Sequence, residues 1–463
     1  MTASEQAIAR KAWPVLLIAC GASFLELLDA SIVNIALYTI RNDLGLSDIG
    51  LQWVVNAYLL MFGGFLLLGG RAADLFGRKR MLTIGLSVFI AASLLGGMAL
   101  NGGWLVAARA AQGIGAAIIA PATLAVLTTY FTDPKQRSGA IGAWIASGVA
   151  GAALGSMIGG LLTDLLDWRW VLWINVPIGI ALLISGLLSL PADQAPTQRR
   201  SFDIAGALSV TAGLVLIVFG TVSAGERGWG SPLSYGSIVI GLVLLGLFLL
   251  IEQRAEQPIL PLDIFNMRTV SSGNAVSFLA NAASLPMFYL MGLFLQEVLG
   301  FSPMTAGLSF LPVSLSIIVG SGVASMLAPK LGARLPMVGG AFIAALGQIL
   351  LSTASPDSTY LGSVLLPSIL IGLGIGLLFV PATTVATAGV PEERSGLASG
   401  LVNTANQFGG ALGVAALATL ATVFATPAEG YTRAMFVAAG VVIVAGLVAF
   451  FVPRQLPAEP QQS

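Results

Sequence analysis

Histidine is absent from this 463-residue chain, and cysteine occurs only once, as Cys20. Without an imidazole the sequence offers neither a histidine proton carrier nor a histidine metal ligand. A single cysteine excludes internal disulfides and cysteine zinc clusters. We therefore expect no metal site and no bound cofactor, and any proton transfer must use carboxyl groups.

Charge is scarce as well. Asp, Glu, Lys and Arg make up only 9% of the residues, against about 25% in an ordinary soluble domain. The 21 basic and 21 acidic residues cancel, so nothing favours a nucleic acid as partner. Hydrophobic residues reach 56%, and this imbalance excludes a soluble enzyme.

The sequence contains many long apolar stretches. A helix that crosses a bilayer needs roughly 20 mostly apolar residues, and the sequence contains fourteen such stretches. The first is too long, and is followed by too many others, to be a cleaved signal peptide. They cover approximately residues 14–38, 51–70, 81–100, 104–131, 138–163, 170–190, 204–224, 234–251, 269–296, 303–328, 335–354, 361–388, 395–424 and 432–452. The prediction is an all-α integral membrane protein.

The basic residues indicate the orientation. With an even number of spans both termini lie on one side, and the loops on that side hold sixteen of the 21 basic residues. The other side has four, and Arg109 falls inside a span. Because cytoplasmic loops are enriched in Lys and Arg, we expect a multi-pass protein of the plasma (inner) membrane with both termini cytoplasmic.

An internal repeat indicates the architecture. Residues 133–139, which lead into span 5, resemble residues 390–396, which lead into span 13 and lie 257 positions later. Gly-Ile-Gly and Pro-Ala-Thr sequences of span 4 likewise recur in span 12. A displacement of eight spans fits two parallel six-helix repeats with two helices inserted between them. The expected units are an N-terminal half (14–190), a linker with the two extra helices (191–268), a C-terminal half (269–452) and a cytoplasmic tail (453–463).

The loop between spans 2 and 3 combines two glycines, one acid and a basic cluster. Its simplest interpretation is a positive-inside anchor. However, Gly-x-x-x-Asp-x-x-Gly-Arg-Lys at this place resembles the signature loop of the major facilitator superfamily. The resemblance implies a gating loop, in which the Asp caps a helix of the opposite half and the first Arg pairs with an acid at the end of span 4. The residues concerned are Gly70, Asp74, Gly77, Arg78, Lys79 and Asp133.

Three ionisable residues lie within spans. Glu26 and Asp29 are three residues apart on span 1, and Arg109 is in the first turns of span 4. Because a charge at the bilayer centre costs at least roughly 2.5–3.5 kcal/mol, these residues are candidates for proton coupling. Desolvation raises a carboxyl pKa and a nearby cation lowers it, so such an acid can bind and release a proton near neutral pH. The alternative is a static ion pair that locks spans 1 and 4 together.

The surrounding motifs narrow the family. Residues 28–37, residues 105–117 with Arg109, and the segments 168–177 and 295–312 resemble motifs of the fourteen-helix drug/proton antiporters of the major facilitator superfamily. The resemblance implies that fold, with two six-helix pseudo-repeats and two inserted central helices. It also implies that the span-4 Arg takes part in proton transfer. The likeness extends from about residue 14 to 452.

A glycine stripe on span 5 resembles the antiporter helix motif Gly-x-x-x-Gly-Pro-x-x-Gly-Gly. It consists of Gly151, Gly155, Gly159 and Gly160, with Ser156 where the motif has Pro. Tyr38 similarly replaces a Pro that usually closes the span-1 motif. The simplest role of such a stripe is close helix packing, and the missing Pro predicts a straighter span 5.

A cavity between the halves would be apolar, with few polar groups, and would suit lipophilic compounds of varied shape. For the polar side chains of the second half, hydrogen bonding between helices is an equally good interpretation. The candidate cavity residues are Glu26, Asn34, Met287, Tyr289, Asn403 and Gln407.

These features together predict a transporter and no enzyme. The leading hypothesis is a proton-coupled multidrug exporter of lipophilic, cationic compounds that works by alternating access as a monomer, driven by the proton motive force. Asp29 would be the protonation switch, tuned by Arg109. One alternative is a narrow exporter of a single metabolite or antibiotic, including tetracycline-like compounds. The remote alternative is a non-transporting membrane sensor or an enzyme of the membrane.

Overall fold

The computed structural model describes residues 3–131, 133–190, 193, 203–255, 258–391 and 394–453, with side chains from Trp13 onward except those of residues 134, 135 and 138. Every regular element in these ranges is a helix. Most of residues 191–203, at the start of the predicted linker 191–268, lie outside the described residues, as does nearly all of the predicted tail 453–463. Those boundaries therefore stay predictions.

The helices of the first half follow the predicted spans, with one break. Span 6 is interrupted at Ile174, giving a single turn and then a longer helix. Polar caps begin several helices: Ser47 accepts a hydrogen bond from the Gly50 amide and Asn101 accepts one from Trp104. The helices are α1 (Ala3–Leu44), α2 (Asp48–Phe76), α3 (Arg78–Gly97), α4 (Gly102–Tyr130), α5 (Pro134–Leu165), α6 (Trp170–Trp173) and α7 (Asn175–Ser189).

Two helices follow that belong to neither repeat. They are α8 (Ile204–Arg227) and α9 (Pro232–Arg254), joined by a tight turn in which Gly228 has a φ of 77°, a conformation that favours glycine. They pack along one another, and α8 also packs against α2 and α15, so the inserted pair lies beside both halves. A short 3-10 turn, η1 (Leu262–Asn266), leads into the second half.

The second half contains more interrupted helices. Span 10 is divided at Phe310, and short π-helical turns end the ninth span and begin the twelfth. The elements are α10 (Arg268–Leu293), η2 (Phe294–Val298), α11 (Pro303–Ser309), α12 (Leu311–Leu331), α13 (Arg334–Leu351), η3 (Tyr360–Val364), α14 (Leu365–Thr387), α15 (Ser395–Ala421) and α16 (Pro427–Ala449).

Thirteen helical segments of the described chain are long and apolar enough to cross a membrane. The predicted span that is not among them is α15, although it has 27 residues. Asn403, Asn406 and Gln407 lower its hydropathy, and it packs on α10, α2 and α16, which shields much of it from lipid. The fourteen predicted helices are therefore all present, one of them more polar than a lipid-exposed span would be.

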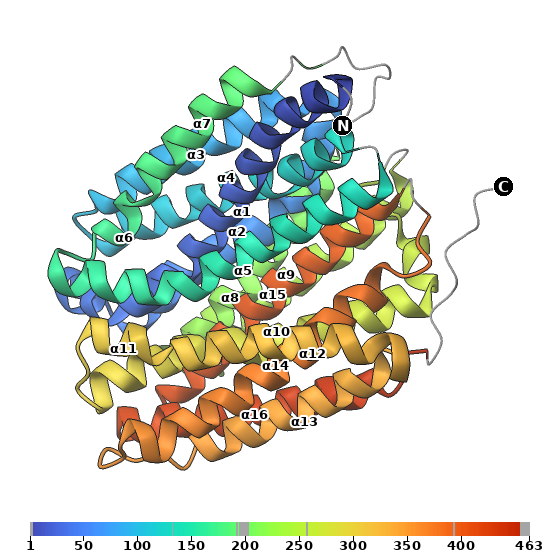
Figure 1. Cartoon of the computed structure of the whole chain (residues 1–463). Helices are drawn as coiled ribbons and strands as arrows, with labels where there is room; N and C mark the ends of the chain where they lie inside the picture. Colours follow the sequence, from blue (N-terminus) through green and yellow to red (C-terminus); the bar gives the residue numbers. More distant parts are fainter. Residues whose placement is uncertain are drawn as a thin grey trace.

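The two halves lie side by side (Figure 1), with α1 to α7 on one side and most of α10 to α16 on the other. Contact between the halves runs mainly through α2 with α15, and through α5 with α11 and α12. We call the end that holds the 76–78 turn and the Arg394 region the basic end, and the opposite one the far end. Arg394 lies 2.6 Å from Asp263 at the basic end.

The glycine stripe brings α5 into backbone contact with α1. A Cβ at Gly155 would lie 2.9 Å from the Leu28 carbonyl oxygen, and one at Gly151 or Gly159 would collide with a carbonyl oxygen of α1. Gly160 meets the backbone of α11, so this glycine faces the other half. Ser156, which stands where the motif has Pro, has its Oγ 3.0 Å from that of Ser31, and α5 continues without a break.

Candidate functional site

Asp29 and Arg109 form a buried ion pair inside the first half. Arg109 donates from Nη1 to Asp29 Oδ2 at 2.6 Å. The Asp29 residue is 0% exposed and Arg109 is 2% exposed. Spans 1 and 4 are therefore joined where the sequence placed its two most unusual charges, and the pair is closed off from bulk water.

Two amides complete the coordination of the Asp29 carboxylate. Asn175 Nδ2 donates to Oδ1 at 2.7 Å and Gln112 Nε2 donates to the same oxygen at 3.0 Å. Gln112 also accepts from Arg109 at 2.9 Å and is 2.8 Å from the Ser93 hydroxyl. The four helices α1, α3, α4 and α7 thus meet in one polar cluster, which we call the Asp29 cluster.

A second set of contacts holds the Arg109 guanidinium. Its Nε donates to the Val54 carbonyl at 3.2 Å, and its Cζ lies 4.4 Å from the centre of the Tyr58 ring. Both partners belong to α2. A cation stacked on an aromatic ring and paired with a carboxylate is well compensated for its lost hydration, which explains how a full charge is tolerated at this depth.

Some members of the Asp29 cluster carried a sequence signal and others did not. Gln112 and Asn175 belong to the span-4 and span-6 motifs, and Gln112 follows Arg109 by three positions, so both lie on one helix face. Ser93 and Tyr58 were not predicted, because a lone hydroxyl in an apolar span is indistinguishable from ordinary packing.

Glu26 has a different environment from Asp29. It is 9% exposed, and within the described part of the chain no hydrogen bond or ion pair reaches its carboxylate. A buried carboxylate without a partner needs a proton or a cation to balance its charge. The two acids of span 1, three residues apart, are therefore not equivalent.

The other predicted cavity residues have different surroundings. Asn34 is buried and donates to the Ala30 carbonyl of its own helix. Met287 is enclosed in the core with 0% exposure. Tyr289 lines a pocket at the far end. Asn403 is exposed and Gln407 is partly exposed, both on α15 where it meets α2.

The predicted gating loop contacts the end of α7 and the residue Asp193 beyond it. The Asp193 carboxylate accepts hydrogen bonds from the backbone amides of Lys79 and Arg80, at 3.0 and 2.9 Å. Lys79 Nζ donates to the Leu187 and Leu190 carbonyls at the end of α7. The turn itself uses Gly77 at a φ of 97°, with Gly70 six residues from the end of α2.

Among the described residues, neither of the two contacts that the motif implies for this loop is formed. Asp74 is exposed, and among the described residues Arg78 makes no ion pair with Asp133. Asp133 instead caps α5, accepting from the Gln136 amide at 2.9 Å. Among the described residues, the Arg78–Asp133 pair that the loop motif implies is therefore not formed.

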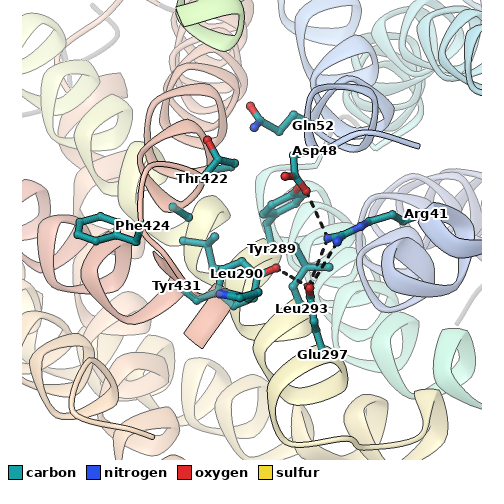
Figure 2. A pocket seen from close by; sticks show the side chains of 13 residues that line it. Arg41, Asp48, Gln52, Tyr289, Leu290, Leu293, Glu297, Thr422, Phe424 and Tyr431 are labelled. Atoms are coloured by element: carbon teal, nitrogen blue, oxygen red, sulfur yellow. Dashed lines mark hydrogen bonds and ion pairs between the residues drawn. The ribbon is translucent and has the colours of Figure 1, made fainter. Parts of the chain in front are cut away.

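The far end carries a polar network that joins the halves (Figure 2). Arg41 of α1 lies 3.3 Å from Glu297 of η2 and 3.3 Å from Asp48 of α2, and the Tyr431 hydroxyl of α16 donates to Glu297 at 2.5 Å. We call Arg41, Asp48, Glu297 and Tyr431 the polar clasp. It borders a pocket of about 130 Å³.

The polar clasp was missed by sequence reasoning. Arg41 and Glu297 stand at span ends, where charged residues are commonplace, and 256 positions separate them in the chain. Their pairing depends on how the halves face one another. In the observed arrangement the polar clasp thus joins the two halves at the far end.

Comparison with known proteins gives relatives that cover most of the chain. The puromycin resistance protein pur8 of Streptomyces alboniger is 41% identical over 95% of this chain and 90% of its own length. The cephamycin export protein CmcT of Amycolatopsis lactamdurans is 42% identical over 88% of this chain and 84% of its own. The multidrug resistance protein Stp of Mycobacterium tuberculosis is 34% identical over 87% and 75%.

Solved structures share the fold at low identity. A bacterial homologue of the human lysosomal transporter Spinster, inward-facing and occupied, has a TM-score of 0.70 at 16% identity and covers 95% of this chain and 96% of that one. A POT family transporter with a thioalcohol-conjugated peptide has a TM-score of 0.71 at 14% identity, covering 94% and 95%. A profile described as Major Facilitator Superfamily matches residues 19–414. With two six-helix halves around buried charges and relatives of this identity, the chain belongs to the major facilitator superfamily.

Proposed function

We propose that the protein exports small lipophilic compounds, preferentially cations, in exchange for protons. The observation that carries the proposal is the buried Asp29–Arg109 pair beside Glu26, whose carboxylate has no hydrogen-bond or ion-pair partner among the described residues. Relatives named for puromycin resistance, cephamycin export and multidrug resistance support the export of small antibiotic-like compounds. The remote alternatives of a sensor or an enzyme have no comparable support, since the family is one of transporters.

The Asp29 cluster has the parts that a proton switch needs. In the observed arrangement Arg109 and two amides stabilise the Asp29 anion. A proton on Asp29 would cancel that charge and leave Arg109 uncompensated, so the packing of α1 against α4 and α7 would have to change. Protonation is thereby tied to helix movement, which is the requirement for coupling.

Glu26 supplies the preference for cations. Because its charge has to be balanced, a cationic substrate and a proton would compete for the same carboxylate, and this competition is itself an exchange mechanism. One proton moving down about 100 mV supplies about 2.3 kcal/mol, and each pH unit adds about 1.4 kcal/mol. No cofactor is required in this scheme.

We further propose that the basic end faces the cytoplasm of a cell whose plasma membrane holds the protein as a monomer. The asymmetry of sixteen basic residues against four supports this orientation. Export would then begin at the basic end, because the polar clasp joins the halves at the opposite, far end.

A transport assay tests the proposed function. Purified protein in proteoliposomes, given an imposed pH gradient, is expected to move ethidium uphill and to release protons when ethidium is added without a gradient. Collapse of the gradient with an uncoupler should stop accumulation. Ethidium movement that does not respond to the pH gradient would contradict proton exchange.

A narrow exporter is the second candidate, favoured by relatives that are named for single compounds. Resistance profiling of a drug-sensitive host against dyes, biocides and antibiotics distinguishes the two candidates. Protection against several unrelated lipophilic cations supports a multidrug exporter, whereas protection against one compound alone supports a narrow exporter.

The polar clasp is expected to hold the far end closed. Glu297→Gln removes the charge with which Arg41 pairs in the second half. A hydrogen bond to a charged group contributes about 1.5–3 kcal/mol to stability. The population open at the far end should rise about tenfold or more, since 1.4 kcal/mol corresponds to a factor of ten. Spin labels at Leu100 and Val423, both exposed at the far end, should report longer distances in a Cys20→Ser background.

Glu429→Gln is the matched control for this change. Glu429 is an exposed acid in the first turn of α16 and lies outside the polar clasp. Its replacement should leave the distance distribution as in the unsubstituted chain. Equal distance distributions for Glu297→Gln and Glu429→Gln would show that the polar clasp does not hold the far end closed.

A further inference from the structure

An apolar chamber lies beside the seam between the halves, where the inserted helices pack. It has a volume of about 520 Å³ and its walls come from α2, α8, α9, α10 and α15, with residues of the segment before α10 at its base. Leu214 and Phe248 contribute from the inserted helices, Leu67 from α2 and Phe408 from α15. Ligand sites of proteins have volumes of about 300–1,000 Å³, so the chamber is large enough for a drug-sized molecule.

The walls contain no charged side chain in the described part of the chain, and their few polar residues are Ser271, Asn274 and Thr404. Ser271 donates to the Phe265 carbonyl and Thr404 donates to the Gly63 carbonyl, so both hydroxyls are engaged. A phospholipid headgroup would find no cation here to bind its phosphate. The chamber therefore favours an uncharged or weakly polar occupant.

Asn274 is the exception among the wall residues. It is 7% exposed, its Nδ2 donates to the Val270 carbonyl at 2.8 Å, and its Oδ1 has no donor among the described groups. Leaving a buried acceptor unsatisfied costs free energy. Because the terminal torsion of Asn is soft, the amide can present this oxygen to an N–H or O–H group in the chamber.

The chamber is also placed to respond to movement of the halves. Its α2 wall includes Gly63 and Gly64, where α2 packs closely on α15 and α8. A Cβ at Gly63 would lie 2.9 Å from Phe408, which lines the chamber too. Because α2 and α15 belong to different halves, any change in their packing alters the chamber wall.

We propose that this chamber is a binding site, formed with the inserted helices α8 and α9, for a small lipophilic molecule that carries an N–H or O–H donor. The donor binds Asn274 and the apolar body fills the chamber. The molecule reaches it from the surrounding bilayer, in which such compounds concentrate. That the bound molecule is subsequently exported rests on the proposed function, whereas its binding does not.

Binding is measured with purified protein in the absence of any gradient, using the fluorescence of N-phenyl-1-naphthylamine, a neutral lipophilic amine with one N–H. Ala275 lines the chamber, so Ala275→Phe should fill it and weaken binding at least tenfold. The control is Val243→Phe on α9, at a side chain that is 64% exposed and not part of the walls. Equal affinity in Ala275→Phe and Val243→Phe would overturn the site.

Asn274→Leu tests the donor contact without filling the chamber, because the two side chains have similar shape. A single lost hydrogen bond should weaken the amine probe about three- to tenfold. The N-methylated analogue, which has no N–H, should bind both proteins alike. If both probes weaken equally, or if a fatty acid displaces them while Asn274→Leu has no effect, the chamber holds an acyl chain and the proposal fails.

The proposed function fails separately from the chamber. Binding of the amine probe that depends on Ala275, in a protein that moves no substrate against a gradient, would leave the chamber intact and reject the exporter. Gradient-driven export, together with binding that Ala275→Phe does not weaken, would reject the chamber and leave the proposed export function intact.

Discussion

Replacing Asp29 with Asn is expected to abolish uphill export while downhill substrate exchange continues. The amide has the shape of the carboxylate but cannot take up and release a proton. Proton movement down the gradient can therefore no longer drive the movement of the helices. We expect gradient-driven ethidium accumulation in proteoliposomes to fall by about 100-fold or more. Losing about 2.7 kcal/mol of coupling free energy corresponds to that factor.

The exchange measurement on the same sample is the internal control, because a misfolded protein would lose both activities. Asp357→Asn is the matched control variant, since Asp357 is exposed in the loop before η3. It should export like the unsubstituted protein. Undiminished uphill export by Asp29→Asn would show that the proton is carried elsewhere, with Glu26 the next acid to replace.

Much of the fold could be predicted because the bilayer restricts what the chain can do. In lipid the backbone must satisfy its own hydrogen bonds, so an apolar stretch of sufficient length becomes a helix, as in α4 and α9. The breaks could not be predicted in the same way. Ile174 and Phe310 lie within apolar runs, and hydropathy alone does not mark them. Each is followed within three residues by a proline, Pro177 or Pro312, which lacks the N–H that a continuous helix would use.

The candidate site could likewise be predicted only in part. Asp29 and Arg109 stand out in the sequence because a charge in an apolar span is costly, and they do pair. The sequence places Glu26 and Asp29 on nearly the same face, yet in the described part of the chain Asp29 has polar partners and Glu26 has none. This difference depends on the positions of α3, α4 and α7 around α1. The spacing of residues along α1 does not predict those positions.

Contacts between the halves were the least predictable. The polar clasp and the chamber each combine residues from three or more helices that are distant in sequence. The inserted helices gave no sequence signal for function, and their chamber becomes visible only when α8 and α9 are placed against α2 and α15.

Arg109→Gln is expected to damage folding as well as transport. It leaves the Asp29 carboxylate fully buried without its cation, and breaking a buried pair by removing one partner costs about 3–5 kcal/mol. The glutamine retains an amide donor but no charge, so the Asn175 and Gln112 contacts cannot compensate. Thermal unfolding in detergent should show a marked loss of stability relative to the unsubstituted protein.

Combining Arg109→Gln with Asp29→Asn separates a coupling role from a structural one. The double variant has no buried charge in the Asp29 cluster, so the cost of an uncompensated buried carboxylate is removed. We therefore expect its unfolding temperature to recover most of the loss, and downhill exchange to return with it. Uphill export should remain abolished, because the cluster can no longer change charge. A static lock between α1 and α4 predicts the opposite for transport: once the fold is restored, a neutral pair would export as well as the charged one.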